Sequence, residues 1–304
     1  MVASNSGTQL VASASAFFGL KHPQIQVEKY NLYLRLCCDR DQQTFVAHQY
    51  ATYPFRLSRT FRLDKSNSSR AYLYLMNVSP GLLAGDRLHI GIQVEANARA
   101  YLTNQSATKV HSMPVLSSIA RTIYAIKVGA KAILEIVPEP LILYKEASFE
   151  QFTEVSLHST SQLFLSEIIV PGRLARAEYY KFNYYLSRLR VLSLEGELIF
   201  GDAMRLDGNL NTFKNSFFFL KFPVIANVVV VLPNTELSSL LKKLDVLQEY
   251  SSKLILGYSH LPNCNGLLVR IMGTDISSVK ICIGHALSYV RQISNQPPLP
   301  EIPK

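Results

Sequence analysis

The chain has 304 residues, 48% of them hydrophobic, so it can bury a large core and fold alone. Its formal net charge of +9 is compatible with an acidic partner, nucleic acid or an anionic surface. The basic residues are scattered, with no run longer than Lys242-Lys243. A solvated basic surface is therefore favoured, and we expect neither nucleic acid nor a membrane as a partner.

The four cysteines have neither the spacing of a disulfide framework nor that of a CxxC metal motif, which is simplest to explain in a reducing cytoplasm; they are Cys37, Cys38, Cys264 and Cys282. The N-terminal residues lack the positive charge and apolar stretch of a signal peptide, so we expect a flexible tail over residues 1–24.

From Lys29 to about Phe200 the chain is rich in β-branched and aromatic residues, and turn signals recur at roughly ten-residue intervals. This pattern predicts a mainly β fold. The clearest strands are expected at Tyr30–Leu36, Tyr72–Met76, His89–Glu95, Ala132–Val137, Leu163–Val170 and around a hairpin turn at Glu195-Gly196.

The apolar stretch from Phe217 to Leu232 is interrupted by Pro223 and falls short of the about 20 residues that a membrane span needs. It predicts two buried strands that are divided at Pro223.

After Pro233 the apolar period becomes helical. One amphipathic helix is expected behind Asn234 and Thr235, and another from Ile276 to Ile293, with a strand at Gly266–Met272 between them. We therefore expect one β-rich domain over residues 25–296, ending in an αβα segment at 233–294 and followed by a Pro-rich tail at 297–304.

Catalytic signatures are missing from the sequence. No phosphate-binding glycine loop occurs, nor a Gly-x-Ser-x-Gly or His-Glu-x-x-His string in its required context. The seven histidines are dispersed, so a resident catalytic zinc is not indicated. We expect no enzymatic activity and no tightly bound cofactor.

Two loops carry unusual polar residues. In the connection from Asn77 to Leu88, Gly81 and Gly85 favour a tight backbone that places Asp86 before a strand, where it could contact a cation or an arginine of a partner; plain turn chemistry is the alternative. The run from Thr103 to His111 surrounds Lys109 with small polar side chains, which suits a wet channel or a contact surface, or a solvated loop.

Glu167 is the most informative single residue. In the strand from Leu163 to Val170, alternation places Glu167 on the same face as Leu163, Leu165 and Ile169. Because an unpaired buried charge is costly, Glu167 must pair with a cation, lie beside an internal water path or bind something. An ion pair with Arg173 or Arg176 is an equally supported alternative.

The remaining carboxylates, among them Glu178 after Gly172-Arg173 and Asp202 after the hairpin, are dispersed along strands. This distribution suits transient handling of a cation, so no stable metal site is predicted.

Taken in order, six strings make the chain similar to the UreD (UreH) family of urease accessory proteins; they are YPFRLSR (53–59), NVSPGLLAGDRL (77–88), TNQSATKV (103–110), LEIVPEPLILYKEA (134–147), SEIIVPGRLARAE (166–178) and GLLVR (266–270). The resemblance implies stacked, β-helix-like sheets with two α-helices in the C-terminal segment. It further implies a cytoplasmic scaffold that binds UreF, recruits UreG through UreF and docks on apo-urease subunits.

The resemblance also implies that nickel passes through the protein in transit, along a path that includes Asp86, Thr108, Glu167 and, less securely aligned, Asp202. The surrounding motif positions are expected to shape loops or bind partners; they are Gly81, Gly85, Lys109, Gly172, Arg173 and Glu178. The alternative is a purely structural adaptor between UreF and urease without a nickel path.

Overall fold

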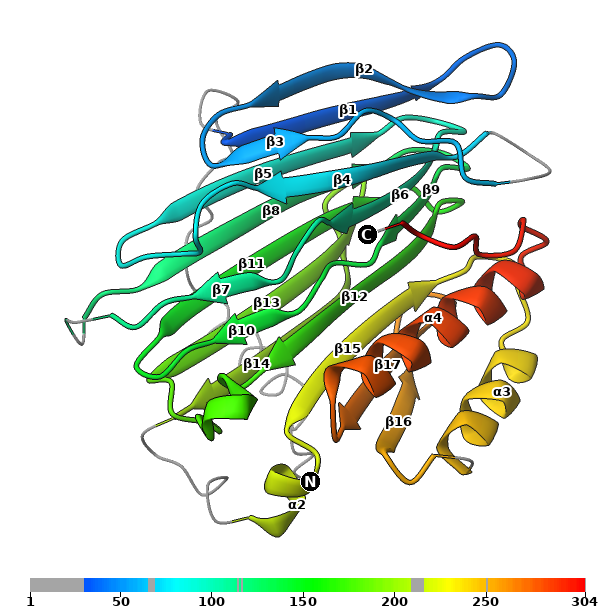
Figure 1. Cartoon of the computed structure of the whole chain (residues 1–304). Coiled ribbons are helices and arrows are strands. Elements are labelled where there is room, and N and C mark those ends of the chain that lie inside the picture. The colour runs from blue at the N-terminus through cyan, green and yellow to red at the C-terminus, as the bar shows by residue number, and fades with distance from the viewer. Residues whose placement is uncertain are drawn as a thin grey trace, which may run out of the picture.

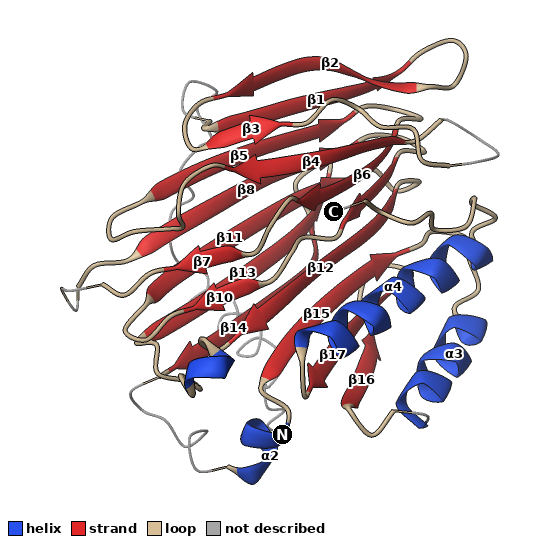
Figure 2. Cartoon of the chain, viewed as in Figure 1, coloured by secondary structure: helices blue, strands red, loops and turns tan. Residues whose placement is uncertain are grey.

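The structure is a computed structural model that describes residues 30–64, 69–113, 115, 117–208, 216–249 and 251–303. The tail expected at 1–24 lies outside the described residues. Strands dominate the described chain, and helices are confined to its C-terminal third apart from short turns (Figure 2). The expectation of a mainly β fold is confirmed.

Two large sheets form the body of the protein (Figure 1). Sheet A has seven strands, in the spatial order β14 (Leu198–Asp207), β13 (Tyr184–Ser193), β11 (Ser148–Leu157), β8 (Ala120–Val128), β5 (Arg87–Val94), β1 (Leu32–Cys38) and β2 (Thr44–Ala51). Its inner strands are parallel, while β2 and β14 pair antiparallel at the two edges.

Sheet B has ten strands, with the main order β16 (Leu254–His260), β17 (Gly266–Gly273), β15 (Val224–Val231), β12 (Gln162–Val170), β9 (Ile133–Ile136), β6 (Arg99–Asn104), β4 (Ala71–Asn77) and β3 (Phe55–Leu57). Two short strands complete it, because β10 (Leu141–Leu143) pairs with β12 and with β7 (Thr108–Val110).

From β4 to β13 the chain passes back and forth between the sheets, so that strands separated by one turn of the winding lie side by side and parallel. This is the stacked, β-helix-like arrangement expected from the family resemblance. The loop Asn77–Gly85 accordingly joins strands of different sheets, since β4 belongs to sheet B and β5 to sheet A.

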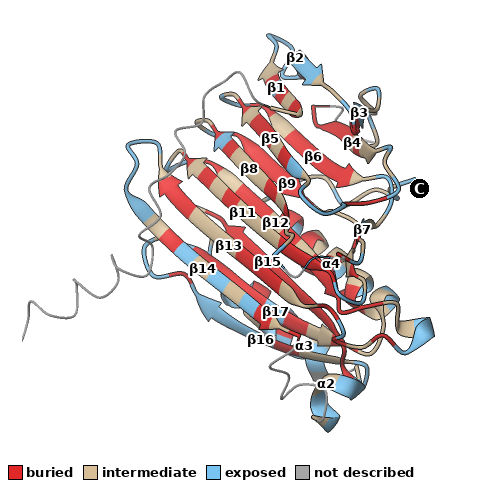
Figure 3. Ribbon diagram, turned by 90° about the vertical axis from the view of Figure 1, so that its left-hand side faces the viewer, coloured by how far each residue is buried: buried red, intermediate tan, exposed pale blue. Residues whose placement is uncertain are grey.

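Two apolar cores flank sheet B. One lies between the sheets and contains alternate residues of β15, such as Ile225 and Val229. The other contains the opposite face of β15, including Val228, and packs against helices α3 (Ser238–Glu249) and α4 (Ile276–Ile293). Figure 3 shows the contrast between the buried inner strands and the largely exposed edge strand β2.

Two features of the C-terminal third differ from the sequence prediction. The segment before Pro223 forms the short helix α2 (Phe217–Lys221), not a strand, so only β15 remains of the two predicted strands. Pro223 has no backbone N–H to donate to a ladder, and coiling lets Phe219 contact Tyr180, with ring centroids 5.9 Å apart.

The predicted αβα segment contains two strands, β16 and β17, between helices α3 and α4. Strand β16 was missed because it is an edge strand whose last four residues are exposed, so it lacks the apolar signal of a buried strand. The helix from Ile276 to Ile293 was predicted correctly, and Asp275 caps it by accepting a hydrogen bond from the Ser278 backbone N–H.

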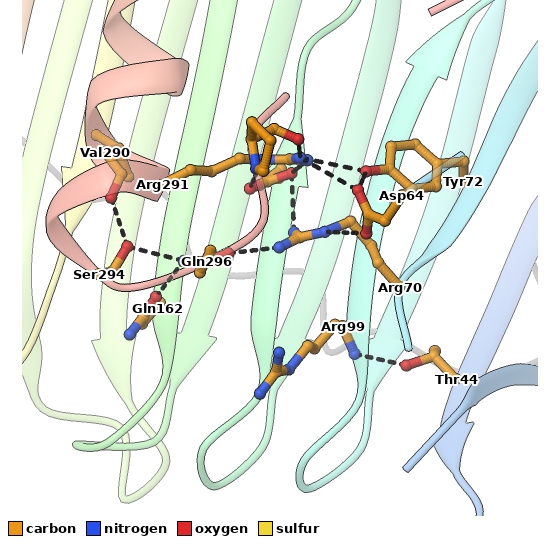
Figure 4. A network of polar contacts seen from close by, with 12 residues as sticks. Thr44, Asp64, Arg70, Tyr72, Arg99, Gln162, Val290, Arg291, Ser294 and Gln296 are labelled. Carbon is orange, nitrogen blue, oxygen red and sulfur yellow. Dashed lines mark hydrogen bonds and ion pairs between the residues drawn. The ribbon is translucent and has the colours of Figure 1, made fainter. Parts of the chain in front are cut away.

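A buried ionic cluster fastens α4 to the outer face of sheet B (Figure 4). It contains Arg70, Arg291, Asp64 and Glu135, whose side chains are at most 2% exposed. Arg291 donates from Nε to Glu135 Oε1 over 2.9 Å, and the Arg70 Nη1 atom lies 2.9 Å from Glu135 Oε2. Two cations and two carboxylates balance, which makes their burial tolerable.

The C-terminal residues continue from this cluster across sheet B, as Figure 1 shows. Arg291 Nη1 donates to the Pro298 carbonyl over 3.4 Å, Arg70 bonds to Gln296, and Tyr74 bonds to the Pro303 carbonyl. Within the described part of the predicted Pro-rich tail, the chain is thus held against the body.

We predict that Leu287→Ala will lower the free energy of unfolding by about 2–5 kcal/mol, because Leu287 is 1% exposed in the core between α4 and sheet B. Ile281→Ala on the same helix is the matched control, since Ile281 is 61% exposed and its loss should change stability by about 0.5 kcal/mol or less. Urea-induced unfolding measures both values, and equal losses would contradict the packing of α4 described above.

Candidate functional site

A cavity of about 90 Å³ lies between the two sheets. Its walls mix apolar side chains, such as Ile126 and Phe149, with polar side chains in similar number; the polar residues are Asn104, Thr108, Thr122, Tyr124, Glu139, Gln151, Thr153, Ser166 and Glu167. Polar side chains in such number are unusual between packed sheets, and they mark this cavity as the candidate site.

Glu167 reaches the cavity from strand β12. Its neighbours on the same face, Leu163 and Ile169, belong to the core between the sheets, whereas Phe164 and Ile168 belong to the core beneath the helices. The predicted alternation is therefore correct. The cross-strand partner of Glu167 in sheet B is Asn227 of β15, which lies on the same inward face.

Neutral donors from both sheets surround the carboxylate. Asn227 donates from Nδ2 to Oε1 over 2.7 Å, and Gln151 donates from Nε2 to Oε2 over 3.2 Å. The Tyr185 and Ser187 hydroxyls approach Oε2 to 3.4 and 3.3 Å. Neither Arg173 nor Arg176 pairs with Glu167, so the ion-pair alternative is wrong; Arg173 is engaged by Glu178 instead.

Burial is the main influence on the ionisation of this group and raises the pKa of the Glu167 carboxyl above its ordinary value. The hydrogen bonds from Asn227 and Ser187 oppose this shift because they favour the anion. The neighbouring phenols respond in the same way, and burial raises the pKa of Tyr124 to about 12. The Glu167 carboxyl group thus lies among phenols that stay protonated at neutral pH.

A polar relay connects Glu167 to Asp202 at the edge of the sandwich. Arg270 of β17 is the cross-strand neighbour of Asn227 and donates from Nη1 to its Oδ1 over 3.0 Å. The second guanidinium nitrogen, Nη2, donates to Asp202 Oδ1 over 2.6 Å. Because Asp202 lies on β14 of sheet A, this relay crosses from one sheet to the other.

Thr108 lines the cavity from β7, where its backbone N–H donates to the Pro140 carbonyl over 2.9 Å. Its neighbour Lys109 is exposed, and what it contributes locally is a carbonyl that accepts from the Leu82 N–H over 2.7 Å. Period-2 alternation explains why two adjacent motif residues have such different surroundings.

Asp86 does not line the cavity. Its carboxylate accepts a hydrogen bond from the Leu83 N–H over 2.7 Å and so closes its own loop. Two glycines make this loop feasible: Gly85 has φ +85°, and a Cβ on Gly81 would lie 2.5 Å from the Lys109 carbonyl oxygen. The sequence left two interpretations of Asp86 open, a contact with a cation or partner and plain turn chemistry. The observed geometry matches plain turn chemistry.

The Gly172 to Glu178 stretch forms a second rigid loop around a short 3₁₀ turn at Leu174–Arg176. Arg173 donates two hydrogen bonds to the Glu178 carboxylate, from Nε over 2.8 Å and from Nη2 over 2.5 Å. Its guanidinium lies 4.5 Å from the centre of the Tyr144 ring. The hydrogen bond from Arg173 holds the pKa of the Glu178 carboxyl below its usual range. These residues therefore shape a surface loop and do not face the cavity.

Sequence reasoning missed most participants in the site, among them Glu139, Tyr185, Asn227 and Arg270. Asn227 carried a usable signal, because it is the single polar residue in the strand Val224–Val231. The other three have no local signal, since their roles depend on neighbours far away in the sequence.

Within the part of the chain that the structure describes, no three side chains of histidine, cysteine, aspartate or glutamate are grouped so that they could hold a metal ion. None of the described helices is long and apolar enough to cross a membrane.

The fold and the site together define a class: a β-helix-like protein with a polar cavity enclosed between its two sheets. A model of the family "UreD urease accessory protein" matches residues 31–304. The chain belongs to this family.

Several curated relatives match along most of their length. A urease accessory protein UreD from Trichodesmium erythraeum is 48% identical over 90% of this chain and 99% of its own. UreD 2 from Brucella ovis is 27% identical over 89% of this chain and 90% of its own, and a UreD from Photorhabdus laumondii is 27% identical over 82% and 78%.

We predict that the stability of the wild type will fall relative to Glu167→Gln as pH rises above the ordinary carboxyl pKa of 4.5. In that range the unfolded chain releases the Glu167 proton while the folded chain retains it, so unfolding is favoured. The difference stops growing once the folded carboxyl also ionises. Denaturant midpoints measured between pH 4 and 8 test this, and parallel curves for the two proteins would contradict it.

Gly172→Ala should destabilise the protein by at least about 1–3 kcal/mol, because φ at this residue is +138° and the added Cβ would lie 1.7 Å from the Glu178 carbonyl oxygen. Gly257→Ala is the control, since its Cβ meets no atom within 4 Å and its φ is ordinary. Thermal unfolding of both variants gives the comparison, and an unaffected Gly172→Ala protein would mean that the loop has another conformation.

Proposed function

We propose that this protein is required for nickel insertion into apo-urease, acting both as a scaffold and as a conduit. In this role it binds UreF in the cytoplasm, recruits UreG through UreF, docks on the urease subunits and lets the nickel ion pass, with no catalytic activity of its own. Membership of an accessory protein family supports the coarse role. The conduit role is carried by one observation, the Glu167 carboxylate enclosed beside a polar cavity.

The chemistry of the cavity suits passage better than storage. Nickel is bound tightly when several nitrogen, sulfur or carboxylate ligands converge, whereas Glu167 is joined here by hydroxyl and amide groups. The Glu167 carboxylate attracts the cation, and weak neighbouring oxygens such as that of Thr108 let it leave again. Of the other expected path residues, Asp202 connects to Glu167 through Arg270 and Asn227, while Asp86 lies in a loop outside the cavity.

Glu167→Ala should lower the nickel content and activity of co-expressed urease while leaving the complex with UreF intact, because the side chain is enclosed between the sheets. Glu154→Ala is the matched control, since Glu154 lies on the neighbouring sheet and pairs with Arg190 over 3.4 Å, away from the cavity. Metal analysis of purified urease and a UreF pull-down give the two readouts. Normal nickel loading in Glu167→Ala would refute the conduit.

A structural adaptor between UreF and urease is the second candidate, and the position of the motif loops favours it. The Asp86 loop is hydrogen-bonded to the strand that carries Lys109, and neither Asp86 nor the exposed Lys109 lines the cavity. If Asp86→Ala abolishes recovery of UreF or urease in the pull-down, this loop is an interface. Lost nickel loading with assembly intact would assign Asp86 to the path instead.

A further inference from the structure

Two basic side chains from the C-terminal third of the chain form ion pairs with two carboxylates near Glu167. Arg270 of β17 engages Asp202, and Lys280 of α4 engages Glu139. Neither basic residue belongs to the core, and both remain partly exposed, at 45% for the Arg270 side chain and 37% for that of Lys280. The carboxylates they contact are more enclosed, at 20% and 11%.

Arg270 bridges the two sheets at their open edge. One of its nitrogens bonds to Asn227, which itself bonds to Glu167, and the other bonds to Asp202 over 2.6 Å. The guanidinium therefore lies between the Asp202 carboxylate at the edge of sheet A and the Glu167 carboxylate at the cavity. A cation that moves from Asp202 toward Glu167 meets this positive charge first.

Lys280 pairs with a carboxylate of the cavity wall. Its Nζ atom lies 3.0 Å from both carboxylate oxygens of Glu139. Glu139 lines the same cavity as Thr108 and Glu167. An ammonium ion that contacts both oxygens of a carboxylate neutralises the point at which a cation would otherwise bind.

Glu167 differs from Asp202 and Glu139, because its hydrogen-bond donors are neutral amides and hydroxyls. Asp202 and Glu139 thus each carry a resident positive charge, whereas Glu167 has none among the described residues. Ion pairs this exposed contribute little to folding stability, so they can open without disrupting the sheets.

We propose that Arg270 and Lys280 are resident counter-ions that a divalent cation must displace from Asp202 and Glu139 in order to reach Glu167. This inference rests on the proposed conduit and adds Glu139 as a cation-binding carboxylate of the cavity. A divalent ion attracts a carboxylate more strongly than a monovalent ion of similar size, so the exchange favours ions of higher charge. The two basic residues act as positioning residues: each leaves its carboxylate when the divalent ion binds.

The test is titration of the purified, tag-free full chain with Ni²⁺ alone, followed by calorimetry. Arg270→Met and Lys280→Met should each tighten Ni²⁺ binding about two- to fivefold, the factor expected for removal of a partly exposed competing ion pair. Arg270→Lys keeps the charge and should bind more like the wild type. Adding Asp202→Asn to Arg270→Met should remove the gain.

Arg190→Met is the matched control, because Arg190 forms a partly exposed ion pair with Glu154 away from the cavity. Circular dichroism unfolding of each variant establishes that it is folded. Unchanged Ni²⁺ affinity in both folded Arg270→Met and Lys280→Met proteins would overturn the proposal, as would an equal gain in Arg190→Met.

The outcomes for this inference and for the conduit are separable. If Glu167→Ala impairs nickel loading of urease but the counter-ion variants bind Ni²⁺ like the wild type, the conduit stands and the counter-ion role is wrong. If Glu167→Ala loads urease normally while Arg270→Met still binds Ni²⁺ more tightly, the counter-ions guard a cation site that is not the route to urease.

Discussion

Sheet B is covered on both faces, and this constraint organises the rest of the protein. Strand β15 is buried along its whole length, with one face in the core against sheet A and the other in the core under α3 and α4. Apolar surface of this extent is stable only when it is removed from water on both sides. The winding of the chain supplies sheet A for one side, and the C-terminal helices cover the other.

The ionic cluster in Figure 4 then sets the orientation of helix α4 on the outer face of sheet B. Apolar contacts have little directional preference, whereas Arg291 can satisfy Glu135 and Asp64 from only one orientation of α4. Breaking such a buried pair leaves an uncompensated charge, which typically costs about 3–5 kcal/mol. The described part of the C-terminal tail depends on the same cluster through Gln296 and Pro298.

The same double coverage explains why the inner face of sheet B can carry function. A carboxylate on a sheet with one face open to solvent would be hydrated by water. Glu167 instead lies between the two sheets and receives hydrogen bonds from Asn227, Gln151 and hydroxyls of sheet A. Such an arrangement surrounds the carboxyl group with neutral hydrogen-bond donors and, within the described part of the chain, no cation. The two basic residues near this site, Arg270 and Lys280, come from the same C-terminal segment that supplies helices α3 and α4.

Local patterns in the sequence determined the β class, the hairpin near Gly196, helix α4, and the inward direction of Glu167, because each depends on neighbours within a few residues. Tertiary structure alone decided which side chains meet. Glu167 lies 60 residues from Asn227, and Arg270 lies 68 from Asp202, so no periodicity links them. Helix α2 and strand β16 also depend on tertiary structure. Their packing partners and position in the sheet determine them, and short-range propensity carries no information about either.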